Sequence, residues 1–166
     1  AGVRVLVIDD NSTNRLILRE TLSRWGAPVF AVGSGEEGIA ELQKAKEAGN
    51  PYRLVLLDQR MPEMDGFRVA ERIKNLPDLA GTAVIMLTSD GMSLATGRSR
   101  ELGIVSCLTK PVKQSELREA INLTLGRFVP PAPRETPPAP EGLGTLNILL
   151  VEDSSANRFL IQAFLK

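Results

Sequence analysis

The stretch VLVIDDNSTNR at residues 5–15 decides the fold, and a second copy of it, ILLVEDSSANR, stands at residues 148–158. Each copy is an apolar run of four residues that ends in two acidic residues and then enters a helix start rich in Ser and Asn, the residue types that cap helices. A short apolar run with these flanks predicts a buried strand whose tip carries carboxylates. The chain therefore holds one unit and the start of another.

Short apolar runs alternate with helical patterns throughout residues 3–126. One helical pattern is Leu18, Leu22 and Trp25, spaced four and three residues apart. Strict alternation of this kind predicts a parallel sheet with helices on both faces, whose strands are continuously apolar because neither face meets water. Five strands are predicted at residues 5–8, 29–32, 54–57, 83–87 and 104–108, each followed by a helix, the fourth of them over residues 93–102.

Charge and residue usage exclude several classes of protein. Lys plus Arg equals Asp plus Glu at 20 each, without a block of like charge, so neither a nucleic-acid surface nor a direct membrane contact is expected. The absence of histidine excludes Ser-His-Asp triads and any phosphohistidine within the chain. Cys107 is the only cysteine, which excludes an internal disulfide. With no apolar stretch that could span a bilayer and no signal-peptide pattern at the start, we expect a cytoplasmic protein.

The composition changes after residue 126. Residues 127–146 contain six of the chain's eleven prolines, which is typical of an extended linker. Residues 147–166 then match only the first strand and most of the first helix of a second unit. We therefore expect a domain at 1–126, a Pro-rich linker at 127–146 and a truncated second copy at 147–166. That copy could form a dimer by pairing with a sheet edge or by domain swapping, or it could simply be a cut tail.

Polar residues follow four of the five predicted strands. In an open parallel sheet, ligands bind outside the carboxyl ends of the strands, where the strand order reverses. In the order 2-1-3-4-5, Asp9 and Asp10 after the first strand would meet Asp58 after the third. Three carboxylates this close would repel one another unless a cation neutralised them, and Mg²⁺ prefers oxygen ligands. Thr88 after the fourth strand and Lys110 after the fifth add a hydroxyl donor and a cation, which indicates phosphoryl chemistry on an aspartate.

Taken together, these motifs resemble the receiver domain of two-component response regulators. The resemblance rests on DD at 9–10, LVLLD at 54–58, MPEMDG at 61–66, MLTS at 86–89 and KP at 110–111. It covers residues 3–126 and implies a flavodoxin-like (βα)5 doubly wound sheet. The helix start after the acids, the stretch KPVKQSEL at 110–117 and the second copy resemble the tandem receivers of hybrid sensor histidine kinases.

The resemblance also implies roles for individual residues. Asp58 would be the phosphoacceptor that takes a phosphoryl group from a phosphohistidine. Asp10, Asp58 and the backbone carbonyl of Arg60 would bind Mg²⁺ directly, and Asp9 would act through water.

Two further residues would contact the phosphoryl group once it is on the aspartate. Thr88 would donate a hydrogen bond to it, and Lys110 would pair with its charge. The partner would be a histidine kinase domain or a histidine phosphotransfer protein. The domain would not be an enzyme beyond catalysing its own phosphotransfer and dephosphorylation.

Two residues depart from the family pattern, and two other functions compete with the first. Cys107 stands where an aromatic switch residue is usual, and Arg60 places a long cation two residues beyond the acceptor. A receiver fold kept as a silent docking or inhibitory domain of a kinase is the main alternative, although it would not need the whole set of polar residues. A magnesium-dependent phosphatase with an aspartyl nucleophile would carry a second aspartate where this chain has Arg60.

Overall fold

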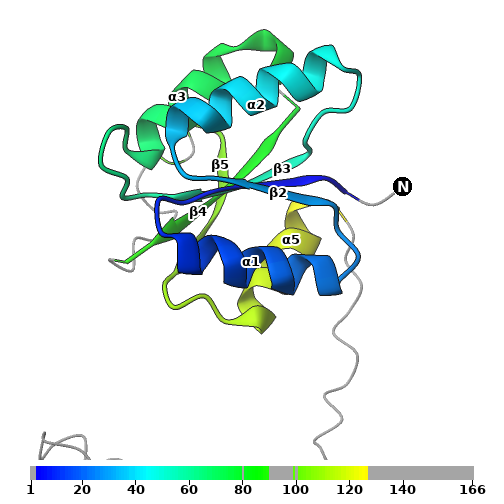
Figure 1. Ribbon diagram of the computed structural model, residues 1–166, viewed down its shortest axis with the longest axis vertical. Helices are drawn as coiled ribbons and strands as arrows, with labels where there is room; N and C mark the ends of the chain where they lie inside the picture. Colours follow the sequence, from blue (N-terminus) through cyan, green and yellow to red (C-terminus); the bar gives the residue numbers. More distant parts are fainter. Residues whose placement is uncertain (1–2, 80, 90–98, 100, 127–166) are drawn as a thin grey trace, which may run out of the picture. The chain divides into compact units, whose positions relative to one another are not determined.

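A computed structural model describes residues 3–79, 81–89, 99 and 101–126 of the chain (Figure 1). The predicted linker, the second copy and nearly all of the helix predicted over 93–102 lie outside the described residues. The described part contains a five-stranded sheet in the order β2-β1-β3-β4-β5, with every neighbouring pair parallel. The predicted strand order is therefore confirmed. The strands are β1 Val5–Ile8, β2 Val29–Val32, β3 Leu54–Asp58, β4 Ala83–Thr88 and β5 Ile104–Thr109.

Helices cover both faces of the sheet, as Figure 1 shows. On one face lie α1 (Ser12–Arg24) and α5 (Gln114–Thr124), and on the other lie α2 (Gly35–Glu47) and α3 (Gly66–Asn75). A short 3₁₀ helix, Pro77–Leu79, follows α3 and was not predicted.

Polar side chains begin the first three helices. The side chain of Asn11 accepts hydrogen bonds from the first turn of α1, Ser34 does the same for α2, and Asp65 for α3. Such caps satisfy backbone N–H groups that have no partner within the helix. The helix start that the sequence indicated after Asp9 and Asp10 is therefore present.

Side chains alternate between two hydrophobic layers along the central strands. In β1, Val5 and Val7 pack under α1 and α5, whereas Leu6 and Ile8 pack under α2 and α3. This two-residue period is that of an extended strand. All residues of β1 and β3, and all but the first of β4, are buried.

The edge strands differ from the prediction that strands would be buried on both faces. Phe30 in β2 is 48% exposed and Val105 in β5 is 45% exposed. That prediction is correct for the central strands and wrong for β2 and β5. An edge strand has only one neighbouring strand, so the helices above and below leave part of its side chains in water.

Two aromatic residues link elements that are distant in sequence. Trp25, the C-terminal cap of α1, lies under the guanidinium of Arg118 in α5, with 4.7 Å between the guanidinium carbon and the ring centre. Tyr52, just before β3, is 2% exposed and donates a 2.7 Å hydrogen bond to Glu41 of α2. Arg4, before β1, lies over the Tyr52 ring and donates to its hydroxyl at 3.0 Å. Apolar packing is thus supplemented by cation–aromatic contacts at the ends of strands and helices.

Candidate functional site

Three charged side chains continue rows of apolar residues that face α1 and α5. Each charge comes two residues after an apolar residue of that face: Asp9 after Val7 of β1, Asp58 after Leu56 of β3, and Lys110 after Leu108 of β5. Backbone hydrogen bonds extend the ladder beyond the strand ends: the N–H of residue 9 donates to the carbonyl of 32, that of 59 to 87, and that of 110 to 88. The charged ends of these rows therefore meet at one edge of the sheet.

The three predicted carboxylates lie together at this edge. One oxygen each of Asp9, Asp10 and Asp58 falls within a group whose members are all within 4.8 Å of one another. Asp9 is fully buried and Asp58 is 5% exposed, whereas Asp10 is exposed. An all-oxygen donor set with one open side is what a hard divalent cation such as Mg²⁺ requires.

Lys110 reaches this cluster from the far side of β4. Its Nζ lies 2.9 Å from Asp9 Oδ2 and 2.9 Å from Asp58 Oδ1. Burial alone would lower the pKa of Lys110, but its hydrogen bonds to Asp58 and Asp9 outweigh burial and raise that pKa. The lysine is therefore a fixed positive charge at neutral pH.

One lysine does not balance three carboxylates. Burial raises the pKa of Asp58, the hydrogen bond from Lys110 offsets this only in part, and the nearby Asp9 charge raises the pKa further. A raised carboxyl pKa means that the ionised form is unfavourable where it lies. A bound cation would remove this excess of negative charge, so the residues present fit a divalent metal ion.

The two neighbouring acids of the first loop have different surroundings. Asp9 Oδ1 accepts a hydrogen bond from the Asn11 N–H at 2.9 Å, and the Asn14 side-chain amide lies 3.3 Å from Asp9 Oδ2. Asp10 instead lines a pocket of about 440 Å³ together with Arg60 and five other residues. Asp9 is thus held by the protein, whereas Asp10 faces space in which a ligand can bind.

The remaining predicted residues lie at or beside the same edge. Thr88, 1% exposed, is the last residue of β4, one position beyond Leu87, which is the register partner of Asp58. The Arg60 N–H donates to Asp58 Oδ1 at 3.3 Å. Cys107 lies within β5 opposite Met86, and burial raises the pKa of its thiol. It is therefore a neutral, half-buried thiol in the sheet.

Two residues beside the acids were missed by the sequence reasoning. Asn14 contacts the Asp9 carboxylate, and the Arg15 side chain donates to the backbone carbonyls of both Asp9 and Asp10. A signal for them was available, because the second copy repeats the Asn-Arg pair as Asn157 and Arg158.

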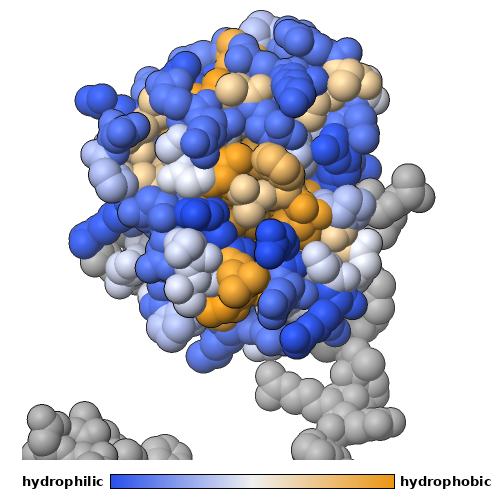
Figure 2. Space-filling model, in the orientation of Figure 1, coloured by the Kyte–Doolittle hydropathy of each residue, from blue (hydrophilic) through white to orange (hydrophobic). Residues whose placement is uncertain are grey.

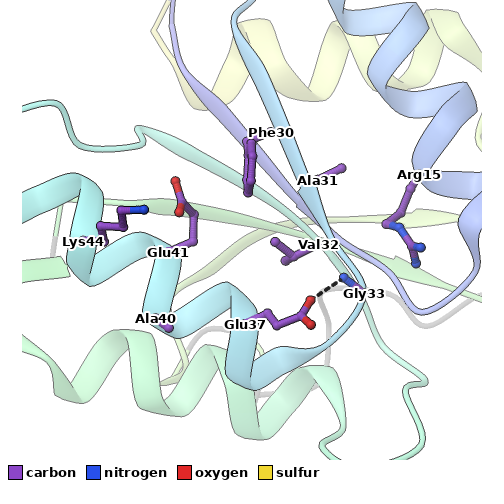
Figure 3. Close-up of a pocket in the computed structure, with 9 residues that line it drawn as sticks. All are labelled: Arg15, Phe30, Ala31, Val32, Gly33, Glu37, Ala40, Glu41 and Lys44. Carbon is purple, nitrogen blue, oxygen red and sulfur yellow. Dashed lines mark hydrogen bonds between the residues drawn. The ribbon is translucent and has the colours of Figure 1, made fainter.

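A groove lies beside the loop of residues 9–11 between β1 and α1, here called the acidic loop, and runs between the exposed edge of β2 and α2. Figure 2 shows that apolar side chains gather on this face, and Figure 3 shows the residues that line the groove. It has a volume of about 590 Å³. Arg15 enters it from α1 on one side and Lys44 from α2 on the other (Figure 3). The lining residues are Arg15, Phe30, Ala31, Val32, Gly33, Glu37, Ala40, Glu41 and Lys44.

Known proteins share both the sequence pattern and the fold. Residues 5–122 match the family model of the response regulator receiver domain. The chain is 30% identical over 125 residues to the probable chemotaxis protein CheY of Rhizobium etli, covering 75% of this chain and 93% of that protein. It is 31% identical over 145 residues to the virulence sensor protein BvgS of Bordetella pertussis, covering 84% of this chain but only 11% of that protein.

Solved structures agree with these sequence relatives. A response regulator receiver domain protein from Clostridium thermocellum superimposes with a TM-score of 0.64 at 30% identity, covering 75% of this chain and 95% of that one. A chemotaxis protein of Vibrio cholerae gives 0.67 at 25% identity, covering 75% and 99%.

The doubly wound sheet with an acidic cluster and a lysine at its carboxyl edge defines a signalling module of the CheY-like class. The chain belongs to the response regulator receiver domain family, and it is a receiver domain of two-component signalling. Among the described residues, no helix is both long and apolar enough to cross a bilayer.

Proposed function

We propose that Asp58 is the phosphoacceptor of this receiver domain. A carboxylate oxygen of Asp58 forms a bond to phosphorus, and the bond between phosphorus and the imidazole nitrogen of a donor phosphohistidine breaks. The electron pair of that bond stays on the imidazole, which then takes a proton from solvent. The observation that carries the proposal is the pairing of one nearly buried carboxylate with Lys110 at 2.9 Å, beside two further carboxylates.

The same cluster is proposed as a Mg²⁺ site. Asp10, Asp58 and the backbone carbonyl of Arg60 would hold the ion, with Asp9 acting through water. A bound Mg²⁺ would supply charge neutralisation between the carboxylates and an incoming phosphoryl group. Support comes from the all-oxygen donor set and from the raised pKa of Asp58, which burial and then the nearby charge of Asp9 raise despite the hydrogen bond from Lys110.

After transfer, two side chains would recognise the phosphoryl group. Lys110 already lies within ion-pair distance of Asp58 and would donate to a phosphoryl oxygen. Thr88, at the end of the adjacent strand, would donate its hydroxyl; the loop after β4, whose movement the sequence suggested as the route of signalling, lies outside the described residues. Cys107 is proposed to have no part in this switch, because its side chain is small and its thiol is neutral.

The proposed partner is a histidine kinase domain or a histidine phosphotransfer protein. Because the chain contains no histidine, the donor imidazole comes from another domain or another protein. Leu16 and Ile17 of α1 are 45% and 55% exposed, about one turn along the chain from the loop that carries Asp10. Docking there would bring a phosphohistidine within reach of Asp58.

The setting of the domain is proposed as that of a hybrid kinase in the cytoplasm. The chain spans 7% to 11% of the hybrid kinase of Dictyostelium discoideum and of BvgS, so the activity of a whole parent protein is itself a proposal. We propose the division into a receiver at 1–126, a linker at 127–146 and the start of a second receiver at 147–166. A dimer formed through that last segment would be detected by light scattering.

Intact-mass spectrometry after incubation with acetyl phosphate and Mg²⁺ tests the acceptor. The chain should gain one phosphoryl group, which Asp58→Asn should abolish and chelation of Mg²⁺ should greatly reduce. Asp78→Asn is the matched control, because Asp78 is an exposed aspartate in the 3₁₀ helix after α3. If the unmutated chain gains no phosphoryl group from acetyl phosphate or from a phosphohistidine donor, the proposal fails and a silent docking domain is the better interpretation.

A further inference from the structure

Arg15 lies behind the acidic loop and binds its backbone. Its Nη1 atom donates to the carbonyl oxygen of Asp9 at 2.7 Å and to that of Asp10 at 2.9 Å. One cationic nitrogen thus holds two consecutive peptide groups. Hydrogen bonds from a charged donor are shorter and stronger than those between neutral groups.

These two bonds restrict the part of the chain that aims the Asp10 carboxylate. The opposite side of the loop is held at Asp9, whose carboxylate accepts from the Asn11 N–H, and at Asn11, whose side chain caps α1. Asp10 itself is exposed, and its backbone carbonyl is held by Arg15. Because the orientation of a peptide plane sets the direction of the adjoining side chain, the guanidinium helps determine whether Asp10 meets Asp58.

The end of β2 leaves room for the guanidinium. Gly33 has no side chain, and a methyl group added to it would lie 3.3 Å from Arg15 Nη1 and 3.6 Å from its central carbon. The Gly33 N–H is held in turn by Glu37 Oε2 at 3.0 Å, which Figure 3 shows as the dashed line beside the Arg15 side chain. Gly33 and Arg15 therefore form one packed unit against the loop.

Charge and geometry predict opposite effects of removing Arg15. The guanidinium is a positive charge near a proposed cation site, so electrostatics alone would make its removal strengthen Mg²⁺ binding. The hydrogen bonds to the loop predict weaker binding, because the ligand would lose its fixed orientation. The sign of the change therefore separates the two effects.

We propose that Arg15 is a positioning residue of the metal site: through the carbonyls of Asp9 and Asp10 it fixes the acidic loop so that the Asp10 carboxylate is presented beside Asp58. The proposal rests on the Mg²⁺ site of the proposed function. Arg15 contacts neither the metal nor the phosphoryl group in this role.

The first test is the dissociation constant of Mg²⁺, measured by isothermal titration calorimetry. Arg15→Met, which keeps a long apolar stem but has no donor, should weaken Mg²⁺ binding about tenfold, the effect typical of losing an outer partner of a metal ligand. Arg15→Lys keeps the positive charge on a shorter side chain with a single nitrogen. Its dissociation constant for Mg²⁺ should lie between those of the unmutated chain and Arg15→Met. Arg19→Met is the matched control, since Arg19 is an exposed arginine on the same helix, and it should leave the constant within twofold.

The second test does not need the metal. In the metal-free protein, Arg15→Met should lower the heteronuclear NOE of the Asp10 and Asn11 amides in NMR spectra, while the amides of α1 beyond the first turn stay as they are. If the unmutated chain binds no Mg²⁺ at millimolar concentration, the proposed metal site fails, and this measurement still decides whether Arg15 orders the loop.

A double-mutant cycle ties the effect to the Gly33 contact. Gly33→Ala should crowd the guanidinium and weaken Mg²⁺ binding several-fold, but it should have no further effect in the Arg15→Met background. Unchanged loop amides together with unchanged or tighter Mg²⁺ binding in Arg15→Met would overturn the proposal. If Gly33→Ala weakened Mg²⁺ binding equally in the unmutated chain and in Arg15→Met, the proposed role of the contact between Gly33 and Arg15 would be overturned.

Discussion

At the scale of single residues, the site is a small cluster of charges that do not cancel. Lys110 contacts two of three carboxylates, and burial still raises the pKa of Asp58. The protein thus keeps a buried carboxylate, the proposed acceptor, whose ionised form is costly while no cation is bound. If Asp58 is the acceptor, the proposed function at this edge has a cost in stability.

This imbalance predicts that Asp58→Asn stabilises the metal-free protein. Removing one of several crowded negative charges should raise the free energy of unfolding by about 1 kcal/mol, the size of a like-charge contact at short range in a water-like dielectric. Lys110 keeps Asp9 as a partner. Urea denaturation followed by circular dichroism measures the change, with Asp78→Asn as control. A less stable Asp58→Asn protein without metal would contradict this account.

The same experiment with Mg²⁺ separates metal binding from repulsion. Mg²⁺ should stabilise the unmutated chain, because a ligand that binds only the folded state adds to its stability. It should stabilise Asp58→Asn much less, since one carboxylate ligand is missing.

The site residues could be predicted from sequence to the extent that their position follows from strand ends. Asp9, Asp10, Asp58 and Lys110 each follow an apolar run, and parallel strands end at one edge, so their convergence follows from the fold. The contact of Arg15 with the loop could not be predicted in this way. It depends on how a long side chain folds back along its own helix start, and strand and helix periodicity carry no information about that.

At the scale of elements, the strands were predicted well and their last residues less so. The apolar runs gave β1 and β2 to the residue, whereas β3, β4 and β5 each extend one residue further, to Asp58, Thr88 and Thr109. Hydropathy ends a strand where polarity begins, but backbone pairing continues until the chain turns. Asp58 and Thr88, the proposed acceptor and hydroxyl donor, are therefore part of the sheet and share its rigidity.

The approach of α3 to β3 predicts a cost for a single methyl group at Gly66. A Cβ there would overlap the carbonyl oxygen of Asp58 and lie 2.9 Å from the Gln59 Cα, both backbone atoms that cannot rotate away. Gly66→Ala should lower the free energy of unfolding by roughly 1 to 3 kcal/mol, as overpacking of a core does. Because Asp58 itself must shift, the rate of phosphorylation should also fall.

Two other glycines serve as controls for Gly66→Ala. At Gly38 a Cβ would meet the Ile8 side chain, whose end can rotate, so Gly38→Ala should cost less and leave phosphorylation nearly unchanged. At Gly81 nothing lies within 4 Å, and Gly81→Ala should be within about 0.5 kcal/mol of the unmutated chain. Equal losses at Gly66 and Gly81 would show that the close approach has no energetic weight.

At the scale of the whole molecule, one buried tyrosine, Tyr52, makes the free energy of unfolding depend on pH in the alkaline range. Burial, followed by the hydrogen bond to Glu41, raises the pKa of Tyr52 from its ordinary value of 10.0 to about 12. Because the pKa is higher in the folded state, this stabilisation is fully present below pH 10 and is lost as pH rises towards 12. Two pKa units correspond to roughly 2 to 3 kcal/mol.

Comparison with Tyr52→Phe isolates this contribution. Lysines titrate over the same range, but they do so in both proteins, so the difference in unfolding free energy between the two should shrink between pH 10 and pH 12. Tyr52 is the only tyrosine, and its ionisation can be followed directly by the absorbance of tyrosinate. Ionisation near pH 10 in the folded protein would contradict the predicted shift.

The chain's only tryptophan, Trp25, is a fluorescent probe of one region of the molecule. Trp25 ends α1, a helix of 13 residues, so it lies about 20 Å along the helix from the acidic loop. Its ring is covered by Arg118 of α5. Its emission should therefore report whether α1 and α5 remain packed, and it should not change when the carboxylates bind an ion. Fluorescence can follow unfolding of this protein continuously during phosphorylation without interference from the chemistry.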